Sequence, residues 1–476
     1  MNKLTKRLSP LLAALLLAAC STVPELKSPA LDVPQAFKEV QAPDGTRWKP
    51  AQPAEAQARG QWWLAFDDSV LTGLIDEATH ANASLAMAAA RVKQARAIAG
   101  ITDASRSVHL GAGVGAQRGR ASAVSLGLPE GTPLAAATSY QAALTASYEV
   151  DLFGRLAAGS SAAQADAQAS EATYKSVLLA LQADVAQTWF RLRAANAELA
   201  TLNRTVDLRA QSVKVNQSRY DNGDIGEFDL ARAKTELATA KAEAIGVQRK
   251  RTQNEHALAV LLGKPASSFT AEDKPLLDAA QLPAIPAGLP SKLLERRPDI
   301  TAAQRAMTAS NARIGVAKSA MFPALALTGS GGGESASLSD VFKWSSRSWV
   351  LGALMSMPIL DGGRNKANIA RSEALLEESV ASYRQSVLVA FAEVEDNLAG
   401  LRILAGQAEQ IDAAVESARR SADLAQKLYD AGRSSYLDLL DAQRNLSAVE
   451  RNAVLLRGDR AVTTVALIRS LGGGWD

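Results

Sequence analysis

The sequence contains a single cysteine, Cys20, and only three histidines among its 476 residues. One thiol excludes an intramolecular disulfide framework. The histidines are far apart in the chain: His80, His109 and His256. No zinc site and no nucleophile–base pair can be drawn from them. The glycine-rich stretches at 111–115 and 331–333 match neither a phosphate-binding loop nor a complete dinucleotide fingerprint. We therefore expect no metal, no cofactor and no catalytic residue.

Proline is missing from two long stretches, 155–263 and 364–472, and aromatic residues make up only 5% of the chain. Both stretches are dense in Ala, Leu, Gln, Arg, Glu and Lys, which lose little side-chain freedom in a helix. Each is interrupted once, by Tyr-Asp-Asn-Gly or Tyr-Asp-Ala-Gly, where the glycine permits a left-handed helix end. The pattern predicts two helical hairpins, with turns at 220–228 and 429–436.

The second hairpin repeats the first at a constant spacing of 209 residues. The recurring positions are Arg155, Tyr220, Gly223, Asp229, Leu262 and Gly263, which return as Arg364, Tyr429, Gly432, Asp438, Leu471 and Gly472. The first helix of each hairpin would span about 65 residues, or about 100 Å. No compact domain can bury such a rod, so we expect it to pack against others like it.

Four shorter segments alternate apolar residues with small or polar ones, at about 106–118, 138–151, 322–333 and 347–360. A period of two predicts strands with one apolar face, and their length is typical of membrane β-strands. Four strands cannot close a membrane barrel, and an open edge in lipid leaves unpaired backbone groups. Either these strands lie outside a membrane, or several chains build one barrel.

Apolar residues at helical spacing predict one helix from Trp62 to about Ala104 and another from about Leu293 to about Ala320. The tryptophan pair at 62 and 63 either forms a binding platform or anchors the helix start in the core, and we favour the anchor. The order of helix, strand pair and hairpin thus occurs twice. The boundaries that follow are a first repeat at 61–263, a proline-rich linker at 264–290, a second repeat at 291–472 and a tail at 473–476.

The N-terminus combines three basic residues with the short apolar run 11–17, which is typical of an export signal and too short to span a membrane. Leu-Ala-Ala-Cys at 17–20 resembles the bacterial lipobox. That resemblance implies a lipoprotein signal peptide at 1–19 and a covalent lipid on Cys20, and Ser21 after it implies the outer membrane. A membrane anchor or a chance cysteine is the alternative. Six prolines predict an extended, lipid-anchored strap at 20–60.

The net charge of +3 belongs to the export signal. Without Lys3, Lys6 and Arg7, the chain has 49 basic residues against 49 acidic ones. Nothing in this balance indicates binding to nucleic acid.

Five segments in order resemble the TolC superfamily. They are Leu-Leu-Glu-Arg-Arg-Pro-Asp-Ile at 293–300, Ala-Arg-Ile-Gly-Val-Ala-Lys-Ser-Ala-Met-Phe-Pro at 312–323, Pro-Ile-Leu-Asp-Gly-Gly-Arg at 358–364, Leu-Leu-Asp-Ala-Gln-Arg at 439–444, and Ala-Leu-Ile-Arg-Ser-Leu-Gly-Gly-Gly-Trp at 466–475. The lipobox and the tryptophan pair narrow the resemblance to the OprM- and NodT-like lipoprotein branch, which serves resistance-nodulation-division pumps. The resemblance implies a mixed, mainly helical fold. Three chains would close a twelve-stranded outer-membrane β-barrel, with loops at 119–137 and 333–346, continued by a periplasmic α-helical barrel.

The same resemblance assigns the site residues. It implies a periplasmic gate after the second turn, made of Leu437, Asp438, Asp441 and Arg444. By spacing alone, the three charged residues share a helix face that could be no more than a solvated surface with a weak ion pair. The first copy has Arg and Thr at the matching positions 232 and 235, so we expect the second hairpin to open. The turns would dock an adapter through Asn222, Gly223, Asp224, Gly432, Arg433 and Ser434.

The function expected from this resemblance is the passive exit duct of a tripartite efflux pump for drugs or other small molecules, and not an enzyme. Its expected partners are two further copies of the chain, a periplasmic membrane-fusion adapter, an inner-membrane resistance-nodulation-division pump and outer-membrane lipid. Two alternatives stay open from the sequence. One is an exit duct for type I protein secretion, and the other is a periplasmic lipoprotein scaffold without a channel.

Overall fold

The computed structural model describes residues 22–26, 29, 34, 36–39, 60–276, 282–283 and 296–473. The predicted signal peptide at 1–19, Cys20, most of the strap and part of the proline-rich linker lie outside these residues. Within them, no helix is both long and apolar enough to cross a membrane.

The chain forms two compact units. The first is built mainly from Arg91–Ser170 and Ala302–Tyr383, and the second from Ala30–Ala90, Glu171–Thr301 and Arg384–Asp476. Each unit therefore takes residues from both sequence repeats, so that a repeat is not a folding unit of its own.

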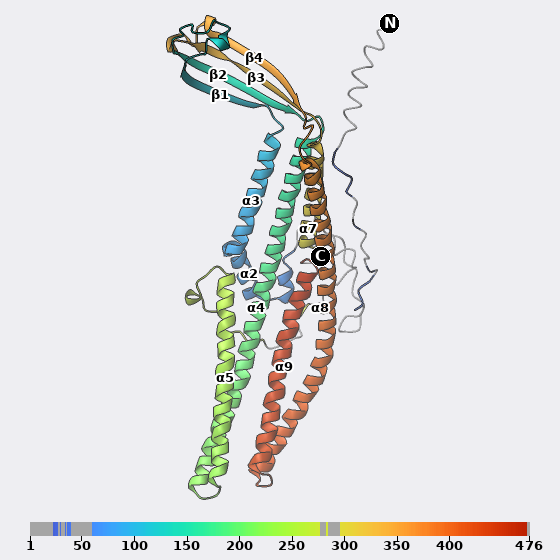
Figure 1. The fold of residues 1–476 in the computed structure, drawn as a ribbon. Coiled ribbons are helices and arrows are strands. Elements are labelled where there is room, and N and C mark those ends of the chain that lie inside the picture. The colour runs from blue at the N-terminus through green and yellow to red at the C-terminus, as the bar shows by residue number, and fades with distance from the viewer. Residues whose placement is uncertain are drawn as a thin grey trace. The chain divides into compact units, whose positions relative to one another are not determined.

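The two helical hairpins have identical dimensions. In the first, α4 spans Arg155–Asp221 and α5 spans Glu227–Leu261, with 67 and 35 residues. In the second, α8 spans Arg364–Asp430 and α9 spans Tyr436–Ser470, again with 67 and 35 residues. Figure 1 shows α5 running beside α4 and α9 beside α8. Every boundary recurs 209 residues later. The predicted fold class, mainly helical with a small antiparallel sheet, is confirmed.

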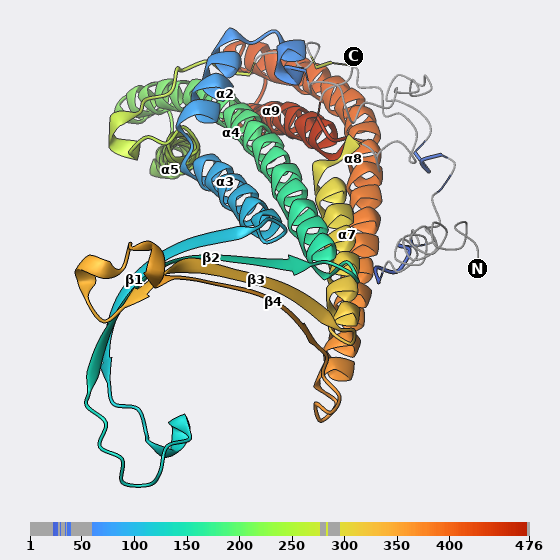
Figure 2. The same cartoon turned by 90° about the horizontal axis from the view of Figure 1, so that it is seen from above.

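The first unit contains one four-stranded sheet in the order β1-β2-β3-β4. Its strands are β1 (His109–Gly119), β2 (Ala137–Val150), β3 (Ala324–Ser335) and β4 (Arg347–Ser356), and all neighbours are antiparallel. Figure 2 shows the four strands side by side and curving together. The order makes β1 and β4 the edges of the sheet.

The register places apolar side chains on one face of this sheet. Leu110 pairs with Ala146, Ala146 with Gly329 and Gly329 with Leu351, and directly opposite residues share a face. This apolar face carries Leu110, Val114, Leu144, Leu327, Trp349, Leu351 and Met355, and the polar face carries Gly111, Thr145, Ser147, Thr328, Ser330 and Glu334. Leu110 and Leu351 are 81% and 76% exposed. The chain by itself does not cover its apolar face.

The strand boundaries differ from the predicted ones by several residues. β4 ends at Ser356 instead of 360, because Pro358 lacks a donor and fixes its own φ. β1 begins at His109 instead of 106, since the turn after α3 occupies residues 105–107. β3 runs two residues further than predicted, to Ser335.

The predicted continuous helix from Trp62 to Ala104 is wrong. The segment consists of a short 3₁₀ helix, Trp62–Phe66, followed by α2 (Ser69–Ala81) and α3 (Ala83–Ala104). Asp67 has a left-handed backbone with φ of 49°, and Asn82 is extended. The Asn82 side chain accepts a hydrogen bond from the Leu85 N–H at 3.0 Å and so begins α3. The second repeat has the single helix α7 (Pro298–Ser319) at this point.

A hydrophobic core holds the second unit together. Its buried side chains come from the 3₁₀ helix, α2, the middle of α4 and α8, and the ends of α5 and α9. They include Trp62, Trp63, Phe66, Leu71, Ile75, Trp189, Leu192, Leu258, Leu262, Leu398, Leu467 and Ile468. Trp62 and Trp63 are both 5% exposed and pack edge to face with ring centroids 5.8 Å apart. Their predicted role as an anchor in the core is confirmed.

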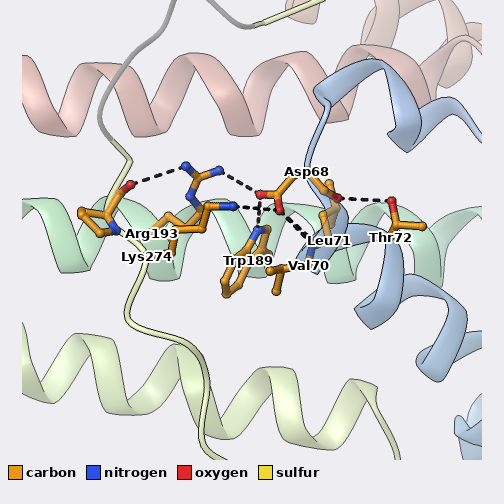
Figure 3. A network of polar contacts seen from close by, with 8 residues as sticks. Asp68, Val70, Leu71, Thr72, Trp189, Arg193 and Lys274 are labelled. Carbon is orange, nitrogen blue, oxygen red and sulfur yellow. Dashed lines mark hydrogen bonds and ion pairs between the residues drawn. The ribbon is translucent and has the colours of Figure 1, made fainter.

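Asp68 connects three parts of this unit (Figure 3). Its carboxylate caps α2 by accepting from the N–H groups of Val70 and Leu71 at 3.1 and 3.3 Å. It also accepts from Trp189 Nε1 and Arg193 Nη1 of α4, both at 2.9 Å. Lys274 Nζ, in the segment after α5, lies 3.4 Å away. One buried side chain therefore joins α2, α4 and the segment around 274.

Candidate functional site

The two hairpin turns have the same backbone geometry. Gly223 and Gly432 have φ of 79° and 67°, the left-handed conformation that the sequence predicts. The N–H of Asp224 donates to the carbonyl of Arg219 at 2.8 Å, and the N–H of Arg433 donates to that of Leu428 at 2.8 Å. Both helices therefore end in a Schellman motif, in which the left-handed glycine allows the following N–H groups to bond the last carbonyl groups of the helix.

The side chains of the two turns differ more than their backbones. The predicted docking residues Asn222, Gly223, Asp224, Gly432 and Arg433 are exposed, and Ser434 is half-buried. Directly after the first turn, Phe228 is 75% exposed. At the second turn, the ring of Tyr436 instead packs on that of Tyr429, with centroids 6.1 Å apart. At the position that matches Phe228, the second turn has Leu437, which is less exposed, at 47%.

Asp438 caps α9. The side chain of Ser435 accepts from the N–H of Asp438 at 3.2 Å, and the Asp438 carboxylate accepts from the N–H of Ser435 at 3.0 Å, which completes a capping box. The hydrogen bond from the Ser435 hydroxyl, at 2.7 Å, lowers the pKa of Asp438. Asp438, one of the predicted gate residues, thus stabilises the N-terminus of α9.

The other predicted gate residues lie on the first turns of α9. Leu437 is 47% exposed and Asp441 is exposed. Arg444 is directed to Glu236 on α5, a residue of the other hairpin. Its Nε donates to Oε2 of Glu236 at 2.9 Å, and a second contact joins Nη2 and Oε1. The bidentate pair replaces the weak ion pair with Asp441 that the spacing on the helix allowed.

The electrostatics of this pair are mutual. The hydrogen bond from Arg444 lowers the pKa of Glu236, although partial burial opposes it. The same bond raises the pKa of Arg444. Glu236 is well covered, with a side chain only 13% exposed, whereas Arg444 is 45% exposed. Both groups remain charged near neutral pH, and water screens the pair only from one side.

Further polar contacts continue along one face of α9 toward α4. Gln443 accepts from Arg209 Nη1 at 2.8 Å, and Ser447 lies 2.9 Å from Thr205. Arg451 Nε donates to Glu198 at 2.6 Å. We call this set, with the Arg444–Glu236 pair, the polar seam; it joins α9 of the second hairpin to both helices of the first.

The seam gives way to close apolar packing further along α9. A Cβ on Gly458 would lie 2.7 Å from the Cβ of Ala194 on α4, closer than two such carbons can approach. Beyond it, Val465, Leu467 and Ile468 are fully buried in the core. The second hairpin is therefore held by hydrogen bonds and ion pairs near its turn and by dense apolar contacts near its core end.

The first copy does not reproduce this chemistry. Arg232, which matches Asp441, forms no ion pair within 4.0 Å of any carboxylate in the described part of the chain. Thr235, which matches Arg444, donates to the carbonyl of Ala231 in its own helix at 3.0 Å. The two hairpins therefore have equal backbones and unequal polar contacts.

Among the described residues, no group of three or more His, Cys, Asp or Glu side chains could hold a metal ion. The lipid expected on Cys20 falls outside these residues.

The sequence analysis missed Phe228 and every residue of the polar seam except Arg444. Glu236 carries no local signal, because its partner is 208 positions away. Phe228 could have been found, since an apolar residue directly after a polar turn cannot reach the core of its own hairpin. Asp68 also carried a signal, because an Asp before an apolar periodic run is a common N-cap.

Comparison with known proteins gives a consistent result. The family model described as "Outer membrane efflux protein" matches residues 74–264 and 289–473. The solvent efflux pump outer membrane protein SrpC of Pseudomonas putida is 34% identical over 470 residues, covering 98% of both chains. The outer membrane protein OprJ of Pseudomonas aeruginosa is 35% identical over 483 residues, covering 100% of this chain and 97% of OprJ. The structure of the open state of the MtrE outer membrane channel of Neisseria gonorrhoeae is 28% identical, with a TM-score of 0.82 over 96% of this chain and 98% of MtrE.

Proposed function

The chain belongs to the outer membrane efflux protein family, and from this premise we propose how it closes and with what it assembles. The protein is an outer-membrane efflux channel with its helical part in the periplasm. It serves a tripartite pump as the exit for small molecules. Two relatives that match this chain over 98% of their own length are named for efflux pumps. This favours efflux over protein secretion.

Three copies of the chain form the channel. The four-stranded sheet leaves β1 and β4 as edges, and an unpaired edge in lipid costs several kcal/mol for each orphaned backbone group. The smallest membrane barrels have about eight strands, so one copy cannot close. Three copies supply twelve strands, with β1 of each chain paired to β4 of the next. The exposed apolar face of each sheet then meets lipid.

The polar seam is the closed-state lock of the periplasmic end. The observation that carries this proposal is the bidentate contact of Arg444 with Glu236, because it ties the second hairpin to the first beside Leu437 and Asp441. Hydrogen bonds and ion pairs can be exchanged for water at small cost, whereas the apolar packing around Gly458 cannot. The turn end of the second hairpin therefore swings out, and its core end stays in place.

Leu437 and Asp441 form the constriction itself. In a trimer each residue occurs three times around the axis, so Leu437 would narrow the passage and Asp441 would set a ring of negative charge. Asp438 contributes its charge to the same end while it caps α9.

Channel conductance in planar bilayers tests the lock. Glu236→Gln removes one charge of the pair, and we expect more frequent opening, by about fivefold for each copy, because a half-exposed ion pair contributes about 1 kcal/mol. Glu227→Gln is the matched control, an exposed glutamate in the first turn of α5. If opening is unchanged in the Glu236→Gln variant, the seam is not the lock.

The hairpin turns dock a periplasmic membrane-fusion adapter, which in turn meets an inner-membrane pump of the resistance-nodulation-division class. The support for this is the exposure of both turns and of Phe228. Cys20 carries the lipid that anchors the chain to the outer membrane, as its lipobox context implies. The pump supplies the energy, and this chain needs no cofactor.

A further inference from the structure

The loop between β3 and β4, residues 336–346, folds back onto the apolar face of the sheet. Gly333 belongs to that face, because it pairs with Ala142 on one side and Arg347 on the other. A Cβ on Gly333 would overlap the carbonyl oxygen of Val341 in the loop. Val341 itself is only 3% exposed. A glycine in the strand thus lets the loop backbone rest directly on the sheet.

The folded loop borders an open cavity of about 700 Å³. Its wall is formed by apolar side chains of the sheet, Val114 and Leu144, and by Phe342 of the loop. Arg347 lines the same cavity at the first residue of β4. The loop therefore extends the apolar face and adds a cationic group at its end.

The loop exposes unusually large apolar side chains. Phe342 and Trp344 are 80% and 79% exposed, and Leu338 is 67% exposed. Trp349, two residues into β4, is 76% exposed on the apolar face. Leaving aromatic surface in water costs about 25 cal/mol per Å², so a cluster of this size is expected to be covered when the protein is in place.

Arg347, which lies over one of these aromatic rings, is available to bind an anion. The guanidinium carbon of Arg347 lies 4.0 Å from the ring centroid of Trp344. No carboxylate pairs with Arg347 within 4.0 Å among the residues that the structure describes, whereas Lys343 is paired with Asp340 at 2.8 Å. The register places Arg118 on the apolar face too, at the loop end of β1. A planar guanidinium matches phosphate well.

We propose that this loop end of the apolar face binds outer-leaflet lipids, with Phe342 and Trp344 among the upper acyl chains and Arg347 and Arg118 on the headgroup phosphates. The proposal rests on the proposed function, which puts the apolar face in the membrane. Toward the loop, the face changes from apolar side chains to aromatic rings and then to basic groups. A bilayer changes in the same order, from acyl chains to the interface and then to the phosphates.

A photo-crosslinking amino acid identifies what covers the loop. Benzoylphenylalanine replaces Phe342 in the full-length protein, which is reconstituted in nanodiscs of phosphatidylglycerol. After irradiation, the masses of the adducts are measured by mass spectrometry. We expect a lipid adduct. The probe at Glu334 is the control, because that residue lies on the polar face, where its carboxylate accepts from Ser139 at 2.7 Å. An adduct to a second copy of the chain, or none at all, at position 342 overturns the proposal.

A probe at Leu351, in the middle of the apolar face, separates this result from the proposed function. If Leu351 yields lipid adducts and Phe342 does not, the sheet is in the membrane and only the role of the loop is wrong. If neither position yields a lipid adduct, the membrane placement of the sheet fails as well, and both proposals fall.

The phosphate contact has its own readout. Native mass spectrometry counts phosphatidylglycerol molecules retained by the protein as it leaves the nanodisc. Arg347→Ala should lower retention about fivefold, since one arginine at an anionic lipid surface contributes about 1 kcal/mol. Arg433→Ala is the control, because it removes the same charge from a hairpin turn in the other compact unit. Equal retention by the two variants contradicts the assignment of Arg347.

Discussion

Asp68 shows how one residue stabilises a junction that no single element could hold. Its side chain is only 3% exposed, and it is surrounded by donors from α2, α4 and the segment around 274. Burial by itself would raise the pKa of Asp68, but the hydrogen bonds from Trp189 and Leu71 and the charges of Arg193 and Lys274 outweigh it, so that its pKa is lowered. The ionised form is therefore the one that the fold requires.

Asp68→Asn should destabilise the protein by about 3–5 kcal/mol, because it leaves the Arg193 guanidinium, only 13% exposed, without its counter-charge. Asn can still cap α2, so the variant isolates the loss of charge. The measurement is the midpoint of thermal or urea unfolding in detergent. Asp67→Asn is the matched control, since Asp67 is exposed and Asn tolerates its left-handed backbone. Equal midpoints for the two variants would show that the buried charge does not contribute.

The same contact should give the wild type a specific acid sensitivity. Because the folded-state pKa of Asp68 is lowered, its contribution is complete above the unfolded value of about 3.9 and is lost as the pH falls through the folded value. The stability difference between wild type and Asp68→Asn should thus be constant near neutral pH and shrink below about pH 4. If the stability difference between the two proteins instead grows on acidification, the pKa of Asp68 is raised in the folded state and not lowered.

At the scale of elements, the two hairpins combine equal backbones with unequal side-chain contacts. Their helices have the same lengths, and their turns share the same left-handed glycine. The second hairpin alone has the capping box and the arginine that reaches Glu236. The first exposes Phe228 to 75%, and the matching Leu437 of the second is exposed to 47%. Under the proposed function, the first hairpin keeps a fixed contact with a partner and the second hairpin moves.

A thiol-directed photo-crosslinker at the turns should capture a periplasmic adapter. Ser434→Cys and Asn222→Cys place the probe in the second and first turn. If Cys20 carries the proposed lipid, the new thiol is the only reactive one, because the sequence has no other cysteine. Lys366→Cys is the control, an exposed position near the start of α8. We expect an adapter of a resistance-nodulation-division pump at both turns and not at 366. Capture of an adapter from an ATP-driven secretion system would instead indicate protein export.

At the scale of the whole molecule, the two faces of the sheet determine where the chain can reside. Leu351 and Val350 are neighbours on β4, but Leu351 pairs with Gly329 on the apolar face and Val350 pairs with Ser330 on the polar face. Both are largely exposed in the single chain, at 76% and 63%. In the proposed trimer, lipid covers Leu351 and the water-filled lumen receives Val350.

Leu351→Lys should therefore impair insertion and Val350→Lys should not. A lysine facing the middle of the bilayer costs about 2–4 kcal/mol for each copy, and the lumen imposes no such cost. The amount of assembled trimer in outer-membrane fractions measures the difference, with the total protein as reference. If the two variants assemble equally well, the assignment of the faces is wrong.

The sequence by itself determined the repeat, the two hairpins and the alternating faces of the strands. Those features follow from local properties, namely helix propensity without proline, a glycine for each turn, and a period of two that sorts side chains between two faces. It erred where a short polar signal outweighs apolar periodicity, as at Asp67 and Asn82, which break one predicted helix into three parts.

Only the tertiary structure decided which side chains meet. Arg444 and Glu236 are 208 positions apart, and Asp68 lies 125 positions from Arg193 and 206 from Lys274. The fold of the β3–β4 loop onto Gly333 likewise depends on the register of three strands. Such contacts leave no mark in a single sequence, because a charged residue on a helix has the same local pattern whether it faces water or a partner. Their identity follows from the packing of whole elements, which the local periodicity does not specify.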